Sequence, residues 1–414
     1  MFDKMKRIAF VDPFSSAQFL AATLQAKKVC PVAIYNQELT PGILEHFYRP
    51  QYFDIVCNTS HWDLATIVNT LRDLHVENIF YGNEFSVSIT DQIANIISPT
   101  YANNPKSSAW RWNKYEMDQR IMESGLPHIQ QIRVGNKLTH EERKMISDTF
   151  SFPVAVKPVQ AGGTQGYAKC DSLSEVEAHL AEIPEEHLTL CANTFVVQEF
   201  IVGEEYIVNT TSLQGKHWVS DVFRNVKHYY QHSNIYQRTE IVDPSEVEWE
   251  ACTIYVKKIL DILGYHNGLA HTEVFYNENG PLLLEVNPRI VGADGYISKI
   301  AQLVYNWSQP SLLVDGLAGS LPDELDYRCT SWGYLVYLNN WQEQHTLRDL
   351  NLPLIQRLPS FKEANLLHPI GKIMGAPRNL LDTAAFALLH HKDLKQLQED
   401  YEQLTNWEKD GILF

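Results

Sequence analysis

The first hundred residues alternate between apolar runs and helix-compatible segments, and this alternation restricts the possible fold more than any other feature. The apolar runs are RIAFVD, VCPVAIYN, DIVCNT and NIFYGN, and helical patterns at residues 15–27 and 63–74 lie between them. Such a rhythm predicts an α/β arrangement with a mostly parallel sheet and helices on its faces. No GxGxxG motif follows the first run, so the dinucleotide-binding fingerprint of dehydrogenases is absent.

The length and charge of the chain exclude several classes of protein. A chain of 414 residues is long enough for two or three packed units. The formal net charge of −16 argues against a nucleic-acid or anionic-membrane binder, because broad basic surfaces hold such partners. A small phosphorylated ligand needs only a few local cations. No apolar run reaches the length of a membrane span, and the start, MFDKMKRIAFVDPF, lacks a signal peptide's apolar core. Six scattered cysteines without a CxxC pair indicate reduced thiols, so we expect a cytoplasmic protein.

The pattern of elements divides the chain into three parts. A polar stretch at residues 101–108 marks the predicted end of an N-terminal α/β domain, which we place at residues 1–105. Beyond it, strand and turn patterns dominate, and helices are expected at residues 113–124, 174–181, 255–263, 297–317 and 393–410. We expect a central subdomain over residues 106–197 and a C-terminal subdomain with an extension over residues 198–414.

A predicted hairpin carries the sharpest chemical signal. In HTEVFYNENGPLLLEVNPR, two β-rich runs flank a turn sequence centred on Asn279. If the hairpin pairs about Asn279, Glu273 and Glu285 lie directly opposite each other, and Asn287 shares the face of Glu285. Like charges in such positions destabilise a sheet, whereas a hard divalent cation removes the penalty. The pattern predicts a Mg²⁺ site at Glu273, Glu285 and Asn287. The alternative is a solvent-facing hairpin with both glutamates in water.

A glycine-rich loop forms the second signal. The segment AGGTQG contains Gly162, Gly163 and Thr164 and follows a strand-like run. Glycines let the backbone approach an anion, and Lys157 lies on the strand that leads into the loop. A lysine in that place often holds phosphate charge. The combination predicts a phosphate site, although each part alone is better explained by a plain β-turn or an exposed strand lysine.

An apolar strand that ends in a short hinge forms the third signal. Gln198, Glu199 and Ile201 lie in the hinge, and Glu205 follows a glycine. An extended hinge leaves backbone groups free to contact an adenine edge, and a later carboxylate can accept hydrogen bonds from ribose hydroxyls. Taken alone, the segment is better explained as an edge strand with a solvated acidic turn.

In chain order these residues resemble the ATP-grasp superfamily over roughly residues 100–300. The resemblance is carried by Lys114, Lys157, the loop at 162–166, the hinge at 198–205, and Glu273, Glu285, Asn287 and Arg289. Its most specific part is EVNPR preceded by HTEV. A closer resemblance, over nearly the whole chain, is to the L-amino-acid ligases, the dipeptide synthetases of peptide-antibiotic pathways. It is carried by YGNE at 81–84, DVFRNVK at 221–227, LGYHNGLAHTEV and the C-terminal EKDGILF.

The resemblance implies an ATP-grasp fold behind an N-terminal parallel-sheet domain, and a role for each matching residue. Lys114, Lys157 and the loop with Gly162, Gly163 and Thr164 would contact ATP phosphates. Gln198, Glu199 and Ile201 would hold adenine, and Glu205 would hold ribose. Glu273, Glu285 and Asn287 would bind two magnesium ions, Arg289 would face the acyl phosphate, and Glu84 would bind a substrate amino group. The sequence departs from the family at two places: Gln198 stands where many relatives carry an acid, and IVGADGY after Arg289 has no bulky aromatic residue at the position where some dipeptide ligases place one.

The implied activity is ATP-dependent ligation of two L-amino acids through an acyl phosphate, with release of ADP and phosphate. ATP and Mg²⁺ are the implied cofactors, with Mn²⁺ as a substitute, and Lys157 and Arg289 are the implied catalytic residues. Amino acids are the expected partners, nucleic acid and membranes are not, and a homodimer is left open. One alternative is an ATP-grasp ligase that joins an amino acid to a different carboxylate or amine. The other is a non-catalytic nucleotide-binding regulator, against which the intact Glu273, Glu285, Asn287 and Arg289 argue.

Overall fold

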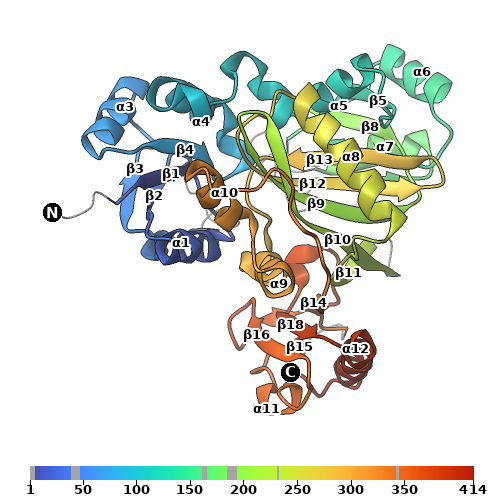
Figure 1. The fold of residues 1–414 in the computed structure, drawn as a ribbon. Coiled ribbons are helices and arrows are strands. Elements are labelled where there is room, and N and C mark those ends of the chain that lie inside the picture. The colour runs from blue at the N-terminus through green and yellow to red at the C-terminus, as the bar shows by residue number, and fades with distance from the viewer. Residues whose placement is uncertain (1–4, 39–46, 161–165, 184–193, 231–232, 342–344) are drawn as a thin grey trace.

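The computed structural model describes residues 5–38, 47–160, 166–183, 194–230, 233–341 and 345–414 (Figure 1). None of the helices in these ranges is both long and apolar enough to cross a membrane. In the described ranges, 3-10 turns connect the larger elements at Pro50–Tyr52, Glu84–Ser86, Pro99–Tyr101, Pro105–Arg111, Ala293–Gly295 and Leu380–Asp382.

The N-terminal part contains the predicted parallel sheet, and its four strands have the order β3-β2-β1-β4. Its strands are β1 (Arg7–Val11), β2 (Cys30–Tyr35), β3 (Ile55–Asn58) and β4 (Asn78–Tyr81). Alternate residues of β1 point to opposite faces: Ile8 and Phe10 pack on helix α1 (Ala17–Ala26). On the other face, Ala9 and Val11 pack with helices α3 (Leu64–Asp73) and α4 (Val87–Ile97). Helices on both faces explain why the first two strands are nearly continuous apolar runs.

A second, antiparallel sheet has the order β5-β8-β6-β7. Its strands are β5 (Gln131–Gly135), β6 (Val154–Pro158), β7 (Ala168–Cys170) and β8 (Thr194–Glu199). Helices α6 (His140–Thr149) and α7 (Leu173–Glu182) cover one face, where Val154, Val156 and Val197 are buried. The predicted boundary between residues 197 and 198 falls inside β8.

The third sheet has eight strands in the order β13-β12-β9-β10-β11-β14-β18-β16. They are β9 (Glu204–Leu213), β10 (Lys216–Tyr230), β11 (Ser233–Ile241), β12 (Gly268–Asn277), β13 (Gly280–Asn287), β14 (Trp332–Leu338), β16 (Phe361–Leu366) and β18 (Ala385–His391). Helices α8 (Val247–Ile262) and α10 (Gln309–Leu317) pack on the first strands of this order. Helix α9 (Tyr296–Tyr305) packs on β11, β14 and β18, and α12 (Leu394–Lys409) packs on β14 and β18. Near the C-terminus lie the short helix α11 (Leu352–Ile355) and the pair β15 (His345–Thr346) and β17 (Ile373–Met374).

Two predicted helices differ from the observed ones. Helix α8 begins at Val247 rather than at residue 255, because buried positions such as Cys252 continue its apolar stripe toward the N-terminus. The expected helix at 297–317 is two helices, α9 and α10. Asn306 adopts a left-handed φ of 64° between them, and Ser308 caps α10. Asparagine tolerates this conformation, so the chain turns there without a glycine.

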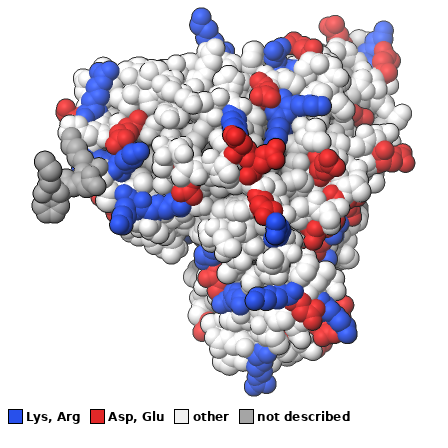
Figure 2. All heavy atoms as spheres, in the orientation of Figure 1, with Lys and Arg blue, Asp and Glu red and all other residues white. Residues whose placement is uncertain are grey.

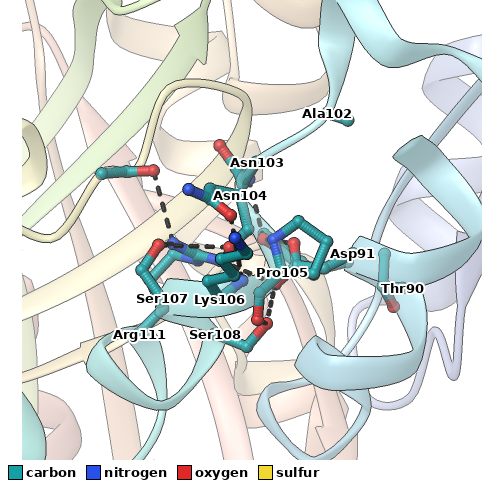
Figure 3. Close-up of polar contacts among 12 residues, drawn as sticks. Thr90, Asp91, Ala102, Asn103, Asn104, Pro105, Lys106, Ser107, Ser108 and Arg111 are labelled. Atoms are coloured by element: carbon teal, nitrogen blue, oxygen red, sulfur yellow. Dashed lines mark hydrogen bonds and ion pairs between the residues drawn. The ribbon is translucent and has the colours of Figure 1, made fainter.

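A buried ion pair lies where the N-terminal sheet meets the rest of the chain (Figure 3). Arg111 Nη2 donates to Asp91 Oδ2 over 2.6 Å, and both side chains are at most 1% exposed. The carboxylate also accepts hydrogen bonds from Tyr81 and Ser108. Arg111 Nη1 reaches the carbonyl oxygen of Leu263, at the end of α8, over 3.2 Å. The network therefore connects α4 of the N-terminal part to the helix that covers the third sheet.

Candidate active site

The β12–β13 hairpin places the two acidic residues face to face. Glu273 pairs with Glu285 in the observed register, which confirms the predicted opposition. Nearer the turn, however, Asn277 pairs with Gly280, and a bulge after Glu273 shifts the register. Without the bulge, Glu273 would face Leu284, and Glu285 would point to the opposite face of the sheet. The symmetric pairing about Asn279 therefore holds only beyond the bulge.

Glu285 is the centre of a set of polar contacts. Asn287 Nδ2 donates to Glu285 Oε1 over 3.1 Å, so both side chains lie on one face, as predicted. Lys114 Nζ lies 2.6 Å from Glu285 Oε2. Burial alone would raise the pKa of Glu285, but the charges of Lys114 and Lys157 outweigh it and hold the pKa well below its usual range. The carboxylate is therefore ionised and available to a cation.

Local structure brings Lys114 and Lys157 together. Helix α5 (Lys114–Glu123) begins at Lys114, and Asn113 caps it by accepting from the backbone N–H of Tyr115. The backbone N–H of Lys114 donates to the carbonyl oxygen of Val159 over 3.1 Å, which ties the helix start to the end of β6. Lys157 lies on β6, one position before Pro158, and only 8% of it is exposed. Burial first, and the charge of Lys114 second, lower the pKa of Lys157 to about 8.

Arg289 and Glu84 are far apart in the sequence and meet in the fold. Arg289 Nε donates to Glu84 Oε2 over 2.8 Å. Glu84 begins a 3-10 turn shortly after β4. Between them the backbone at Gly82 passes so close to β1 that a Cβ there would lie 2.5 Å from the carbonyl oxygen of Val11, so the position requires glycine. Buried Asp12 accepts a hydrogen bond from Ser86 in the same turn. The turn is thus fixed at the carboxyl ends of β1 and β4, where ligands of open parallel sheets bind.

The hinge residues lie along the end of β8. Gln198 is buried, and its Nε2 donates to Gln131 Oε1 over 3.2 Å. Glu199 is bonded to Gln130 through both its side chain, at 2.8 Å, and its backbone N–H, at 3.0 Å. Ile201 is partly buried just after the strand. An adenine contact to Glu199 would therefore use its carbonyl group rather than its side chain or N–H.

Glu205 lies on β9 and is held by two donors. Asn225 Nδ2 and Lys227 Nζ each donate to it over 2.6 Å, one to each carboxylate oxygen. Each oxygen keeps a second lone pair that can accept from a ribose hydroxyl. Gly162, Gly163 and Thr164 lie outside the described residues, and the loop re-enters the described chain at Gly166.

Four of the residues described above line one pocket. It is lined by Glu84, Phe85, Trp112, Lys114, Met117, Gln160, Glu285, Val286 and Asn287. Glu273 and Lys157 interact electrostatically with Lys114, so both lie close to this pocket. On the face drawn in Figure 2, a group of acidic and basic side chains gathers near the middle of the upper part of the molecule, and elsewhere the two signs are interspersed. Two carboxylates and an amide oxygen are hard oxygen donors that suit Mg²⁺ and leave positions for phosphate oxygens.

Asp118 is a residue that sequence reasoning missed. It lies one helical turn after Lys114 and is 5% exposed. Burial is the main reason that the pKa of Asp118 rises to about 6. Its Oδ2 atom has no hydrogen-bond partner within the described part of the chain. In the sequence, only the spacing indicated that Asp118 lies near Lys114, because residues four apart share a helix face.

Comparisons with known proteins show what the chain is similar to. Residues 150–297 match the family model described as an ATP-grasp domain, and this span contains Lys157, Glu273, Glu285, Asn287 and Arg289. Dapdiamide A synthase of Enterobacter agglomerans is 28% identical over 255 residues, which cover 58% of this chain and 60% of that protein. The chain thus spans less than two thirds of the relative's length.

Solved structures match nearly the whole chain. The L-amino acid ligase from Bacillus licheniformis has a TM-score of 0.74 at 18% identity, with 97% of each chain covered. An N5-carboxyaminoimidazole synthetase from Staphylococcus aureus, complexed with ADP, has a TM-score of 0.69 at 15% identity and covers 97% of this chain and 98% of its own. At such identities the similarity shows the fold, and the fold resemblance expected from the sequence is confirmed.

Proposed function

Because the chain belongs to the ATP-grasp superfamily, we propose that it is an ATP-dependent carboxylate–amine ligase that joins two L-amino acids into a dipeptide. One observation carries the proposal: Glu84, Lys114, Glu285 and Asn287 line a single pocket, and Arg289 is bonded to Glu84 at its edge. Cations for phosphate, oxygens for a divalent ion, and a carboxylate for a substrate ammonium are all present there. A protein that only binds nucleotide has no need of a carboxylate that binds a substrate ammonium group.

The chain's own residues account for the first step. Lys114 and Lys157 would neutralise the charge of the ATP phosphates, and their burial strengthens that interaction. Glu273, Glu285 and Asn287 would hold Mg²⁺, which would supply Lewis-acid stabilisation of the phosphate charge. A donor carboxylate oxygen forms a bond to the γ-phosphorus while the bond from that phosphorus to the bridging oxygen breaks. ADP leaves, and the donor becomes an acyl phosphate.

The second step uses Arg289. The acceptor amine forms a bond to the acyl carbon, the carbon–oxygen bond to phosphate breaks, and the amine loses a proton, which the departing phosphate can accept. The guanidinium of Arg289 can donate two hydrogen bonds to the oxyanion that develops on the acyl oxygen. Glu84, on the far side of Arg289, would hold the ammonium group of an amino-acid substrate. Water must be excluded throughout, because it would hydrolyse the acyl phosphate.

A second candidate keeps the same chemistry with a different partner. The relative dapdiamide A synthase favours it, since that protein is named for a diamide. In that case the chain would join an amino acid to a carboxylate or amine that is not an amino acid. The short side chains of Ala293 and Asp294, close after Arg289 where some dipeptide ligases place an aromatic residue, would leave room for such a partner.

A product screen tests both candidates. Purified protein is incubated with Mg-ATP and pairs of amino acids, and released phosphate is measured for each pair. The proposal expects phosphate and ADP with at least one pair, and a dipeptide of matching mass. Phosphate release only with other carboxylates or amines would favour the second candidate. No release with any pair or partner, despite ATP binding, would contradict both.

A further inference from the structure

A row of polar side chains crosses the third sheet directly beside the two acidic residues. Asn287 on β13 pairs with His271 on β12, His271 pairs with Asn209 on β9, and Asn209 pairs with Asp221 on β10. Residues that are directly opposite share a face of the sheet, so the four side chains form one line. Glu273 lies two residues after His271 and therefore shares this face.

Hydrogen bonds run continuously along the row to Glu273. Ser220 Oγ and Asn209 Nδ2 donate to the two oxygens of Asp221 over 2.7 and 2.5 Å. The amide oxygen of Asn209 then faces His271 Nδ1 at 3.0 Å, and His271 Nε2 lies 3.0 Å from Glu273 Oε1. Asn209 presents its amide oxygen to Nδ1, and Glu273 presents a carboxylate oxygen to Nε2, so each ring nitrogen faces an acceptor. Both ring nitrogens of His271 are thus engaged, and the ring cannot turn without breaking a hydrogen bond.

The row is buried where it leaves the site. His271 is 6% exposed, Asn209 0% and Asp221 1%. Polar groups are stable at such depth only when they are hydrogen-bonded, so the row is a costly arrangement unless its contacts are complete. Glu273 Oε2, by contrast, has no hydrogen bond or ion pair within the described ranges. One oxygen of Glu273 is held, and the other is left for a ligand.

We propose that His271 is a positioning residue for Glu273, with Asn209 and Asp221 as its anchor. His271 fixes Glu273 Oε1, so that Oε2 is left for the divalent ion that Glu273, Glu285 and Asn287 would hold. This inference rests on the proposed function. Partners behind a metal ligand orient it, and their loss typically lowers metal affinity about 10–100-fold.

The chain offers a matched control in His217. It lies on β10 of the same sheet, its side chain is 4% exposed, and it also bridges a hydroxyl and a carboxylate. His217 Nδ1 contacts Ser212 Oγ at 2.7 Å, and Nε2 contacts Asp261 Oδ1 at 3.2 Å. Asp261 has no part in the proposed site. His217→Leu removes a buried histidine of the same kind at a place where no metal effect is expected.

The test measures Mn²⁺ affinity in the presence of ADP by electron paramagnetic resonance, and ADP affinity without metal by calorimetry. His271→Leu should weaken Mn²⁺ binding about 10–100-fold and leave metal-free ADP affinity unchanged. His271→Gln, whose side-chain amide can replace Nε2 as donor to Glu273, should recover part of the loss. His217→Leu should bind Mn²⁺ as the wild type does. If His271→Leu does not fold, Asn209→Ala, which frees the ring, should show a smaller loss in the same direction.

Several outcomes would overturn the inference. One is an Mn²⁺ affinity of His271→Leu that stays within about twofold of wild type, and another is an equal loss of Mn²⁺ affinity in His217→Leu. The others are an Mn²⁺ affinity of His271→Gln no higher than that of His271→Leu, and an unchanged Mn²⁺ affinity in Asn209→Ala. Each of these would leave the proposed function standing, provided that the wild type binds Mn²⁺. If the wild type bound no Mn²⁺ with ADP, the metal site would fail, and the inference with it.

Discussion

Arg289 Nε donates a 2.8 Å hydrogen bond to Glu84 Oε2, across 205 positions of sequence. The two side chains are only 20% and 14% exposed, so the pair is largely shielded from water. Glu84 follows the N-terminal sheet and Arg289 follows β13, which means that each part of the chain supplies one charge. A substrate anion must compete with Glu84 for Arg289, and a substrate ammonium must compete with Arg289 for Glu84. The pair therefore holds both groups in place before substrate arrives.

Replacement of Arg289 by lysine should separate ligation from nucleotide binding. Lysine keeps the charge but loses the planar fork that donates two hydrogen bonds. We expect Arg289→Lys to bind ATP normally and to lose roughly 10²-fold or more in ligation rate, the size of effect seen when one oxyanion donor is removed. Calorimetry and a dipeptide assay on the same variant check this. Arg328→Lys, at a side chain that is 78% exposed, is the control. A ligation rate that fell only in step with ATP affinity would make Arg289 a scaffold residue.

Replacement of Glu84 by glutamine should affect the amino-acid substrate and not ATP. Glutamine has a similar volume but no charge to attract an ammonium group. We expect the KM for one amino acid to rise about tenfold or more, since a charge-assisted hydrogen bond contributes about 1.5–3 kcal/mol. Steady-state kinetics with each substrate varied in turn identify which amino acid is affected. The exposed Glu77→Gln variant serves as control. An unchanged KM for both substrates would refute the role of Glu84.

The lowered pKa of Lys157 predicts that ATP affinity and the stability of the ligand-free protein both depend on pH. Since this pKa is about 8, the ammonium group is charged at pH 7 and loses its proton above pH 8 in the free protein. ATP affinity should therefore fall as pH rises above about 8. Lys157→Arg should flatten the profile, because arginine stays charged, whereas the exposed Lys137→Arg should not change it. ATP titrations between pH 7 and 10 check this, and a wild-type affinity that stays constant would contradict it.

The second dependence concerns stability without ligand. The unfolded chain binds the Lys157 proton more tightly than the folded chain, so stability should rise with pH between about 8 and the ordinary lysine pKa. Lys157→Met should accordingly be more stable than wild type at pH 7, by up to about 3 kcal/mol. It should also bind ATP much less tightly. Urea unfolding at pH 7 and pH 10 measures the difference, and a less stable Lys157→Met would show that the ammonium group is well solvated.

Replacement of Glu285 should remove the metal dependence together with the activity. Glu285 lies opposite Glu273, and its loss leaves Lys114 without its 2.6 Å partner. We expect wild-type protein to form ADP and phosphate only with Mg²⁺ or Mn²⁺ and an amino-acid substrate, and Glu285→Ala to form almost none. Chromatography of the nucleotides checks the products. Full activity of Glu285→Ala would refute the site, and AMP with pyrophosphate would place the enzyme in an adenylating class.

The buried Asp91–Arg111 pair should contribute strongly to stability. Removal of one partner leaves an uncompensated charge in the interior, which typically destabilises a protein by about 3–5 kcal/mol. We expect Asp91→Ala to lower the midpoint of urea unfolding clearly. The exposed pair Arg120–Glu123, at 3.3 Å, provides the comparison. Glu123→Ala should change stability by about 1 kcal/mol or less. Equal midpoints for the two variants would show that the interior pair is dispensable.

Much of the fold and part of the site follow from sequence periodicity. The parallel strands at the start, helix α5 and the opposition of Glu273 and Glu285 were predictable because they depend on neighbours close in the chain. The bulge that brings Glu285 into register was not, since a strand pattern does not show which residue will be unpaired. Asn306 likewise breaks a continuous apolar stretch by adopting a conformation that its neighbours do not reveal.

Contacts between distant segments were harder to predict. Glu84 was a candidate for an ammonium group, but nothing in the sequence indicated that Arg289 would bind it. The row from His271 to Asp221 depends on the register of neighbouring strands. The sequence around each of these residues therefore does not indicate that they contact one another. Roles of single residues in the hinge remain predictions, because Gln198 and Glu199 are engaged by neighbouring side chains and backbone in ways that a sequence pattern does not contain.

The pairing of β11 with β14 has a practical consequence for truncation. Arg238, Thr239 and Glu240 of β11 pair with residues 334–336, so the C-terminal strands complete a sheet that begins at the β12–β13 hairpin. A chain shortened after Leu317 would expose the hydrogen-bonding groups of β11 along its open side. Unpaired strand edges recruit strands from other molecules. Such a fragment should form aggregates during expression, even though every residue of the pocket is still present.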